Sequence, residues 1–378
     1  MIDIPKIKVL YREIPVGTLQ LDPSTGVSVF EYDKSWLSHG FSLSPTELPL
    51  QSGLIFADKE KFDGNFAVFE DSLPDGYGLY LLERILNNDG TSLSQLNPLQ
   101  RLSIIGTSGM GALSYLPMMP GIRHQEELKG LEQLDIIQDE ALKVLSEKTS
   151  GDAALLYYNS ANSGGARPKA MFQAEDGSHW IVKFRHTYDP LDIGKDELLY
   201  MTTARECGVS VPRIGLVKDK YFAIERFDID SNGQKQHVLT AAALLKTNFR
   251  NQNVDYTNLL ALTGFLTQDP MQVEEMFRRM VVNLVVDNKD DHAKNFSFIC
   301  SQEGKWRLSP AYDITYSPTG TRGEHATSLF YDGKPDINLV LKAGTGIRIP
   351  LERCYEIINT VETVCEKNLP VVKKLTSD

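Results

Sequence analysis

The stretch from Asp287 to Asp313 constrains the fold more than any other part of the chain. It reads DNKDDHAKNFSFICSQEGKWRLSPAYD, an acid-rich loop followed by two short apolar runs with a polar turn between them. The runs Phe296–Ile299 and Trp306–Leu308 predict a β-hairpin. Because a hairpin returns the chain to where it began, we expect Asp313 to lie beside Asn295.

The pattern Asp290-x-x-x-x-Asn295 supplies groups that phosphoryl transfer needs. That chemistry depends on positioning an acceptor hydroxyl and on Mg²⁺ held by oxygen ligands. Asp290 is placed to take the hydroxyl, while Asn295 and Asp313 are candidate Mg²⁺ ligands. Alone, the cluster from Asp287 to Asp291 is better explained as a polar loop that caps the preceding helix. The order of the upstream segments favours the functional interpretation.

Composition bounds the class of protein. The 378 residues are 42% hydrophobic and 24% charged, which predicts a soluble globular protein with a sizeable core. No apolar run has the length of a membrane span and the first residues lack a signal-peptide pattern, so a cytoplasmic protein without membrane contact is expected. The net charge of −11 disfavours direct nucleic-acid binding. The cysteines are scattered, which favours free thiols.

A glycine-rich loop, Asn162–Arg167, precedes the predicted strands Lys169–Ala174 and His179–Phe184. Its backbone amides can close over phosphates because no side chain blocks the approach. The residues assigned to this contact are Ser163, Gly164, Gly165 and Ala166. Lys183, on the second strand, can reach the α- and β-phosphates of ATP, which is the layout of a kinase N-lobe. Neither GxGxxG nor a P-loop is present, and Lys183 alone would more often be a solvated strand residue.

A predicted helix, Asp196–Cys207, and a predicted strand, Tyr221–Glu225, come next. Glu197 lies in the first turn of the helix, where an acid suits the helix dipole, or it pairs with Lys183 and orients it. The strand runs into an expected inter-lobe hinge. Backbone groups of Glu225 and Phe227 are assigned to the adenine edge, and Asp228 to the ribose.

Other segments complete the expected architecture. The sequence predicts helices over Gly78–Leu86 and Leu134–Glu147, a tight turn over Gly106–Gly111, another turn over Asp152–Tyr158, and a helix beginning at Pro270. The pattern is β-rich at the start and mainly helical after Val238. We therefore expect an α+β, two-lobed, protein-kinase-like fold. The predicted domains are a β-rich N-terminal subdomain (1–120), a kinase N-lobe (121–228) and a mostly helical C-lobe (229–378).

The chain resembles the HipA family of bacterial serine/threonine kinases, which are the toxin halves of HipA/HipB toxin-antitoxin pairs. The resemblance rests on VGTL, LPLQ, EDSLPDGYG, GGARPK, VKF, AIERFD, DDHAKNFS and PAYDI, which cover nearly the whole chain. It implies a kinase related to the phosphatidylinositol-3/4-kinase-like folds, with Asp290 as catalytic base and Asn295 and Asp313 as Mg²⁺ ligands. Lys183 becomes the phosphate-binding lysine. His292 becomes a phosphate contact or a packed loop histidine.

The resemblance also implies cofactors and partners. These are ATP and Mg²⁺, a protein substrate such as an aminoacyl-tRNA synthetase, and a HipB-like helix-turn-helix antitoxin through which DNA would be contacted only indirectly. Such kinases can phosphorylate a serine of their own glycine-rich loop. The aligned position here is Asn162, so its neighbour Ser163 becomes the candidate. Two alternatives stay open, a small-molecule kinase and an antitoxin-bound co-repressor with little turnover.

Overall fold

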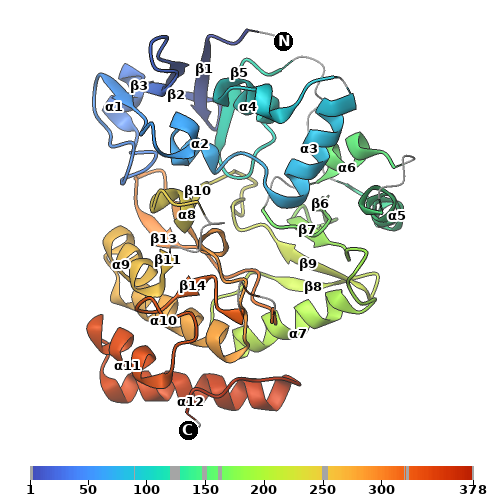
Figure 1. The fold of residues 1–378 in the computed structure, drawn as a ribbon, viewed down its shortest axis with the longest axis vertical. Helices are drawn as coiled ribbons and strands as arrows, with labels where there is room; N and C mark the ends of the chain where they lie inside the picture. Colours follow the sequence, from blue (N-terminus) through green and yellow to red (C-terminus); the bar gives the residue numbers. More distant parts are fainter. Residues whose placement is uncertain are drawn as a thin grey trace. The chain divides into compact units, whose positions relative to one another are not determined.

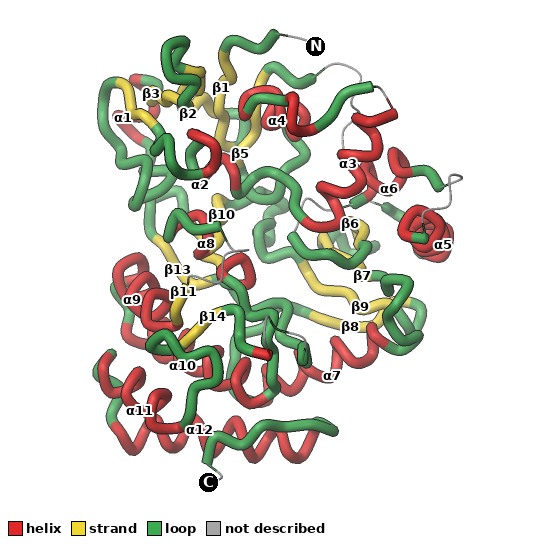
Figure 2. The backbone as a smooth tube through the Cα atoms, in the orientation of Figure 1, coloured by secondary structure: helices red, strands yellow, loops and turns green. Residues whose placement is uncertain are grey.

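The structure, a computed structural model, describes residues 3–88, 90–119, 128–146, 151–160, 164–248, 254–318, 320 and 323–376. The chain divides into two compact units. The first comprises Met1–Gly194, Leu216–Leu239 and Cys300–Gly304, and the second comprises Lys195–Gly215, Thr240–Ile299 and Lys305–Asp378. Each unit contains both helices and strands (Figures 1 and 2), so the predicted mixed α and β composition is confirmed.

The first unit begins with an antiparallel five-stranded sheet in the order β4-β3-β2-β1-β5. Ile7 and Val9 of β1 are buried, whereas Lys6 and Lys8 are exposed, as expected of a strand with one face on a core. The elements of this part are β1 (Lys6–Tyr11), β2 (Ile14–Leu21), β3 (Ser28–Tyr32), α1 (Lys34–His39), β4 (Leu54–Phe56), η1 (Phe62–Gly64), α2 (Ala67–Glu70), α3 (Gly76–Asn88), η2 (Leu93–Gln95), α4 (Pro98–Ile105) and β5 (Leu113–Leu116).

The remainder of the first unit includes most of a four-stranded sheet in the order β6-β7-β9-β8. Buried side chains of α3, α5 and α6 form one core with those of β6, β7 and β9, and Figure 1 shows these helices beside that sheet. The elements are α5 (Gln133–Leu145), α6 (Ala153–Asn159), β6 (Lys169–Gln173), β7 (His179–Lys183), β8 (Ile214–Val217), β9 (Tyr221–Glu225) and β10 (His237–Thr240). The predicted strand over Tyr221–Glu225 is confirmed without a shift.

One local prediction was wrong. The segment Asp152–Tyr158, expected to be a turn, forms the helix α6. The side chain of Asp152 accepts a hydrogen bond from the backbone N–H of Leu155, which is an N-cap. Leu156 and Tyr157 are buried in the core of the first unit, so the helix is stabilised by packing as well as by its cap.

The second unit is mainly helical. Asp269 caps α10 by accepting from the backbone N–H of Met271, and Pro270 occupies the first turn, as the sequence predicted. Helices α9, α10 and α12 pack together, and the predicted hairpin is formed by β12 and β13. The elements are α7 (Ile193–Glu206), α8 (Ala241–Leu244), β11 (Val254–Asp255), α9 (Tyr256–Thr267), α10 (Pro270–Val285), η4 (Ala293–Asn295), β12 (Ser297–Cys300), β13 (Trp306–Leu308), β14 (Thr327–Ser328), α11 (Ile337–Gly346) and α12 (Leu351–Asn368).

A buried histidine makes the stability of the first unit sensitive to pH. His237 is 1% exposed, and its Nε2–H donates to the carbonyl of Leu43 at 2.7 Å. Burial lowers the pKa of His237 to about 4, against the smaller opposing effect of the Leu43 hydrogen bond. In the unfolded chain, the imidazole of His237 takes up a proton as the pH falls below its ordinary pKa of about 6.5. In the folded chain, the imidazole stays neutral until the pH reaches about 4. Stability is full above the unfolded pKa and is lost as the pH falls.

We expect this histidine alone to remove about 2 kcal/mol from the free energy of unfolding between about pH 7.5 and about pH 5. Urea unfolding at the two pH values, on wild type and on His237→Gln, measures the effect. Glutamine keeps a side-chain N–H for Leu43 but does not titrate. The wild type should lose about 2 kcal/mol more than the variant. Equal losses in the two proteins would contradict the assignment.

Candidate active site

The loop that carries Asp290 and Asn295 follows α10 directly and closes on itself. The side-chain amide of Asn295 donates to the backbone carbonyl of Asp290 at 2.7 Å, and its backbone N–H donates to the carbonyl of His292 at 2.8 Å. The chain enters this loop through Asp287, whose φ of +55° turns it sharply away from the helix. The two residues of the predicted pattern are thus joined by a direct hydrogen bond.

The carboxylate of Asp290 faces solvent. Its side chain is 70% exposed, and its Oδ1 lies 3.9 Å from Nε2 of the mostly buried His292. That distance is too long for a hydrogen bond. Because 70% of its side chain is exposed, the carboxylate of Asp290 can be approached by an acceptor hydroxyl, as a base or orienting group requires.

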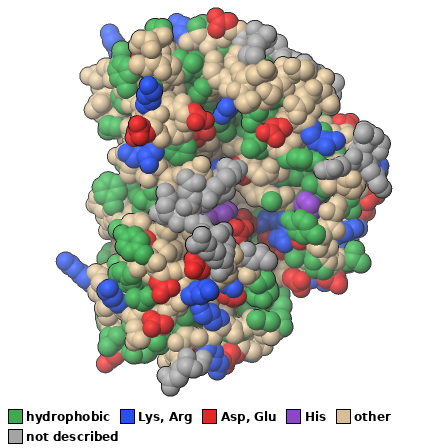
Figure 3. Space-filling view, viewed as in Figure 1, with side chains coloured by type: hydrophobic (Ala, Val, Ile, Leu, Met, Phe, Trp, Pro, Cys, Tyr) green, Lys and Arg blue, Asp and Glu red, His purple; other side chains and the backbone are tan. Residues whose placement is uncertain are grey.

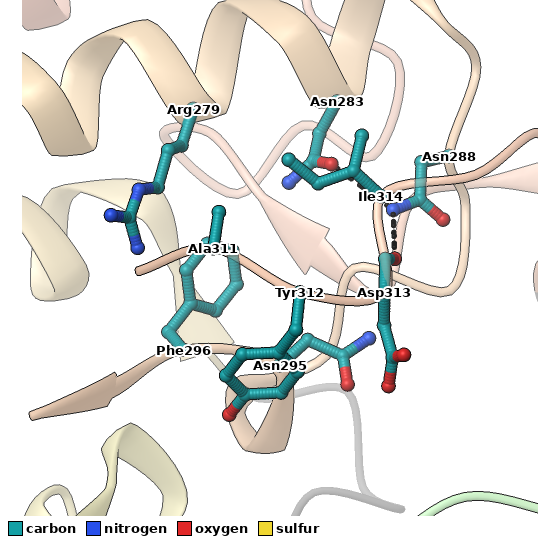
Figure 4. A pocket seen from close by; sticks show the side chains of 9 residues that line it. All are labelled: Arg279, Asn283, Asn288, Asn295, Phe296, Ala311, Tyr312, Asp313 and Ile314. Carbon is teal, nitrogen blue, oxygen red and sulfur yellow. Dashed lines mark hydrogen bonds between the residues drawn. The ribbon is translucent and has the colours of Figure 1, made fainter. Parts of the chain in front are cut away.

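Asp313 follows the hairpin and shares a pocket with Asn295. Their side chains lie next to each other (Figure 4), and both residues belong to the second unit. Asp313 has a φ of +55°, a conformation that needs support in a non-glycine residue. The side-chain amide of Asn288 gives that support by donating to the Asp313 carbonyl at 3.2 Å. The pocket is lined by Arg279, Asn283, Asn288, Asn295, Phe296, Ala311, Tyr312, Asp313 and Ile314.

Asn295 and Asp313 suit Mg²⁺ by the type of atom they offer. Since Nδ2 of Asn295 is used by the loop, Oδ1 is the atom left to bind a cation, next to the carboxylate of Asp313. Mg²⁺ prefers oxygen ligands and keeps several waters, so one carboxylate and one amide with substrate phosphates make a sufficient set. Among the described residues, no three His, Cys, Asp or Glu side chains gather as a metal cluster of their own.

A chain of buried hydrogen bonds stabilises this arrangement. Asn288 also donates to Oδ1 of Asn283 at 3.0 Å, and Asn283 donates to the hydroxyl of Tyr256 at 3.1 Å. That hydroxyl in turn donates to Oδ2 of Asp291 at 2.5 Å. Burial raises the pKa of Tyr256, and the charge of Asp291 adds to the effect, so the hydroxyl stays protonated and donates. The network links the backbone at Asp313 to the neighbour of Asp290.

Asp291 has the opposite environment to Asp290, although the two are adjacent in sequence. It is 0% exposed, and it also accepts from His325 Nδ1 at 3.0 Å and from the backbone N–H of Thr327 at 3.2 Å. Sequence reasoning missed this supporting set. One residue of the sequence could have indicated this network. Asn283 is a polar residue within the apolar run MVVNLVV, and an amide buried there needs hydrogen-bond partners.

The glycine-rich loop belongs to the first unit. The structure describes Gly164, Gly165 and Ala166 of the predicted contact, whereas Ser163 lies outside the described residues. Gly165 has a φ of +101°, which a side chain would not tolerate. The ammonium of Lys169 donates to the carbonyl of Gly164, which ties the loop to the start of β6.

Lys169 and Lys183 lie directly opposite each other on β6 and β7. The backbone N–H of Phe184 bonds to the carbonyl of Pro168 at 2.8 Å, so the lysines form the adjacent, non-hydrogen-bonded pair, whose side chains lie closest. Lys183 Nζ also lies 5.5 Å from the ring centroid of Phe222. Lys169 is buried and its ammonium is held by the carbonyl of Gly164, so it supports the loop, whereas the phosphate contact of Lys183 stays a prediction.

The predicted hinge residues follow β9. Glu225 ends the strand and is half-buried, as is Phe227, and their contacts to adenine stay predictions. Asp228 differs, because it is 1% exposed and accepts from Arg226 at 2.8 and 3.0 Å and from the N–H of Gly111 at 2.9 Å. A shielded carboxylate engaged in this way is unsuited to a ligand. Its geometry supports a structural role, anchoring the Gly106–Gly111 turn, in place of the expected ribose contact.

Two further predictions concern α7 and the surface. Glu197 lies on α7 and is buried, and its pairing with Lys183 stays a prediction. On the face seen in Figure 3, acidic and basic side chains of the described residues intermingle. Among the described helices, none is at once long and apolar enough to cross a membrane.

Two models of known protein families match the chain, one over its N-terminal residues and one over its C-terminal residues. Residues 161–369 match the HipA-like C-terminal domain, and residues 7–116 match the HipA N-terminal domain. The chain is 24% identical over 341 residues to the serine/threonine-protein kinase toxin HipA of Shewanella oneidensis MR-1, covering 80% of this chain and 73% of that protein. It is 26% identical over 228 residues to the putative kinase Y4dM of Sinorhizobium fredii NGR234, covering 53% of this chain and 55% of that protein.

A solved structure shares the fold. The complex of HipA with HipB and its operator DNA from Shewanella oneidensis MR-1 contains a chain that matches with a TM-score of 0.70 at 20% identity. The match covers 97% of this chain and 92% of that one, so the fold likeness extends over both units.

Proposed function

The chain belongs to the HipA family, and from that premise we propose that it is a serine/threonine-protein kinase that transfers the γ-phosphate of ATP to a protein hydroxyl. The observation that carries the proposal is the loop in which the exposed Asp290 is hydrogen-bonded to Asn295, which shares a pocket with Asp313. These are an orienting acid and two oxygen ligands, the minimum set for this chemistry.

The second unit supplies the groups for transfer. Asp290 accepts a hydrogen bond from the serine or threonine hydroxyl and aims its oxygen at the phosphorus, which is mainly a positioning role. Oδ1 of Asn295 and the carboxylate of Asp313 would hold Mg²⁺, which would neutralise charge on the phosphates. The Asn288 hydrogen bond keeps Asp313 in its strained backbone conformation, so the carboxylate needs no reorganisation.

The first unit supplies groups that hold ATP. The ammonium of Lys183 attracts the phosphates, and the backbone of the glycine-rich loop approaches them without steric hindrance at Gly164 and Ala166. The N–H of Gly165 is bound by Asp75 and the ammonium of Lys169 by the carbonyl of Gly164, so these two groups hold the loop. Glu225 and Phe227 bind adenine through their backbone. His292 contacts phosphate, with a packed loop histidine as the alternative.

We extend the proposal to the finer class of the fold, a phosphatidylinositol-3/4-kinase-like arrangement. Its support is the order in this chain of glycine-rich loop, Lys183 strand, hinge strand β9 and catalytic loop. A structure with a bound ATP analogue tests it. Adenine found away from the end of β9 would refute it.

Toxin function and partners form the next part of the proposal. The matched relatives are a kinase toxin named HipA and a complex of HipA, HipB and operator DNA. We propose a HipB-like helix-turn-helix antitoxin as partner, with DNA reached only through it because this chain carries a net charge of −11. The proposed target is a translation protein in the cytoplasm, such as an aminoacyl-tRNA synthetase. Ser163 is the proposed site of self-phosphorylation, which phosphopeptide mapping after incubation with ATP tests.

The experiment that tests the proposed function is transfer of labelled γ-phosphate from ATP to a cell extract and to the protein itself. We expect label on a discrete protein band with Mg²⁺, and none after chelation of the metal or in the Asp290→Asn variant, because both the ligand pocket and the orienting acid are required. Mass spectrometry of the band identifies the target.

The alternatives give different results in the same assay. A small-molecule kinase would label sugars or other low-mass acceptors and leave protein bands blank. An antitoxin-bound co-repressor would bind ATP without transferring label, and would instead tighten operator binding by its partner. Either result would overturn the protein-kinase proposal.

A further inference from the structure

A segment of the HipA N-terminal domain holds the glycine-rich loop. Oδ1 of Asp75 accepts a hydrogen bond from the backbone N–H of Gly165 at 2.9 Å. Two residues later, the backbone N–H of Tyr77 donates to the carbonyl of Gly165 at 3.0 Å. Both polar backbone groups of one loop residue are therefore bound by Asp75–Tyr77, a segment that lies 90 positions away in the chain.

The fit between the two segments is close. A Cβ added to Gly164 would lie 2.9 Å from Oδ1 of Asp75, and one added to Gly76 would lie 2.3 Å from the carbonyl oxygen of Gly165. Gly76 also has a φ of +46°, which disfavours any side chain there. The two turns can meet only because each presents a glycine to the other, which explains the glycines in DGYG and GGARPK.

Charges of opposite sign fix the peptide plane between Gly164 and Gly165. Its carbonyl accepts from the ammonium of Lys169, and its N–H donates to the carboxylate of Asp75. In a trans peptide these two groups point in opposite directions. A flipped plane would turn the carbonyl toward the carboxylate and the N–H toward the ammonium, and both contacts would then be repulsive. Asp75 and Lys169 thus select one of the two orientations.

We propose that Asp75 is a positioning residue for ATP, through which the N-terminal domain sets the conformation of the phosphate-binding loop. The inference rests on the proposed function, because it takes the glycine-rich loop as the phosphate contact. Without Asp75, the peptide between Gly164 and Gly165 can adopt both orientations until ATP binds. Ordering this peptide on binding costs free energy, so the affinity for ATP is weaker.

The test is ATP affinity, measured by titration with a fluorescent ATP analogue, together with the KM and kcat of transfer. Asp75→Ala should raise Kd and KM for ATP about tenfold, since it removes a charge-assisted hydrogen bond, while kcat changes less than about twofold. Asp75→Asn keeps an oxygen acceptor for Gly165 but loses the charge and can also donate to a flipped carbonyl, so it should restore only part of the affinity. Asp58→Ala is the matched control, because Asp58 also accepts a backbone N–H, from Glu60 at 2.9 Å, but is exposed and makes its bond outside the loop.

Each possible result supports or overturns the role of Asp75 in ATP binding. Unchanged affinity in a folded Asp75→Ala protein would overturn the proposal, and tighter binding would mean that Asp75 competes with phosphate for the N–H of Gly165. If the alanine variant does not fold, Asp75→Glu replaces it: the carboxylate moves by one methylene, and affinity should fall at least threefold. A wild type that binds no ATP would refute the proposed function itself, whereas wild-type binding with no effect of Asp75 refutes only this inference.

Discussion

Asp290→Asn is expected to lower the rate of phosphoryl transfer by about 10²- to 10⁴-fold, the usual contribution of a positioned acid or base. The amide has nearly the shape of the carboxylate, but its neutral oxygen is a weaker hydrogen-bond acceptor for the hydroxyl and cannot take up its proton. The hydrogen bond from Asn295 goes to the backbone carbonyl of residue 290, which the substitution leaves in place. The ligand pair of Asn295 and Asp313 is therefore preserved, and ATP affinity should change less than about twofold.

A neighbouring acid provides the control. Asp287 lies in the same loop, pairs with Lys289 at 2.8 Å and is mostly buried as a side chain. Its φ of +55° is one that asparagine adopts readily, so Asp287→Asn makes the same chemical change without strain. Transfer by this variant should stay within about threefold of wild type, since only a partly exposed ion pair is lost.

Rates of transfer at saturating ATP and Mg²⁺, with Kd for ATP from the same preparations, separate the two roles. A loss of less than about tenfold in Asp290→Asn would remove Asp290 from the transfer step. A parallel loss of ATP affinity would instead make it part of the nucleotide or metal site. Equal losses in the Asp290→Asn and Asp287→Asn variants would point to a general disturbance of the loop.

Local patterns made much of the fold predictable. Strand β9 and the β12–β13 hairpin follow from apolar runs bounded by polar turns, and α10 from its Asp-Pro start. The grouping of Asn295 with Asp313 also followed, because a hairpin dictates where its two ends meet. In each case the determining residues are close together in sequence, so the chain itself carries the geometry.

Partners from distant segments were not predictable in the same way. Sequence reasoning assigns Asp228 to the ribose and gives Asp75 no role, yet Asp75 binds Gly165 and Asp228 binds Gly111, across sequence separations of 90 and 117 residues. Nothing local marks an acid as the acceptor of a remote backbone N–H. The adjacent acids Asp290 and Asp291 show the same limit, because burial, which depends on tertiary packing, gives them opposite roles.

The remote contact of Asp228 leads to the largest expected effect on stability. Its carboxylate and the guanidinium of Arg226 are both buried, and they form two hydrogen bonds, at 2.8 and 3.0 Å. Burial raises the pKa of Asp228, but the charge and hydrogen bonds of Arg226 and the N–H of Gly111 outweigh it, so the net pKa lies below the ordinary value. The stabilising pair is therefore fully formed above about pH 4 and is lost only as the pH falls through that lower pKa.

Asp228→Ala should lower the free energy of unfolding by about 3–5 kcal/mol, because it leaves Arg226 charged and buried without its counter-ion and the N–H of Gly111 without an acceptor. Urea denaturation at neutral pH measures the loss. The double variant Arg226→Met, Asp228→Leu removes both charges and should recover at least about 2 kcal/mol of it, since an apolar pair of similar volume pays no desolvation penalty. A double variant no more stable than Asp228→Ala would show that the bond to Gly111, rather than the buried ion pair, accounts for the role of Asp228.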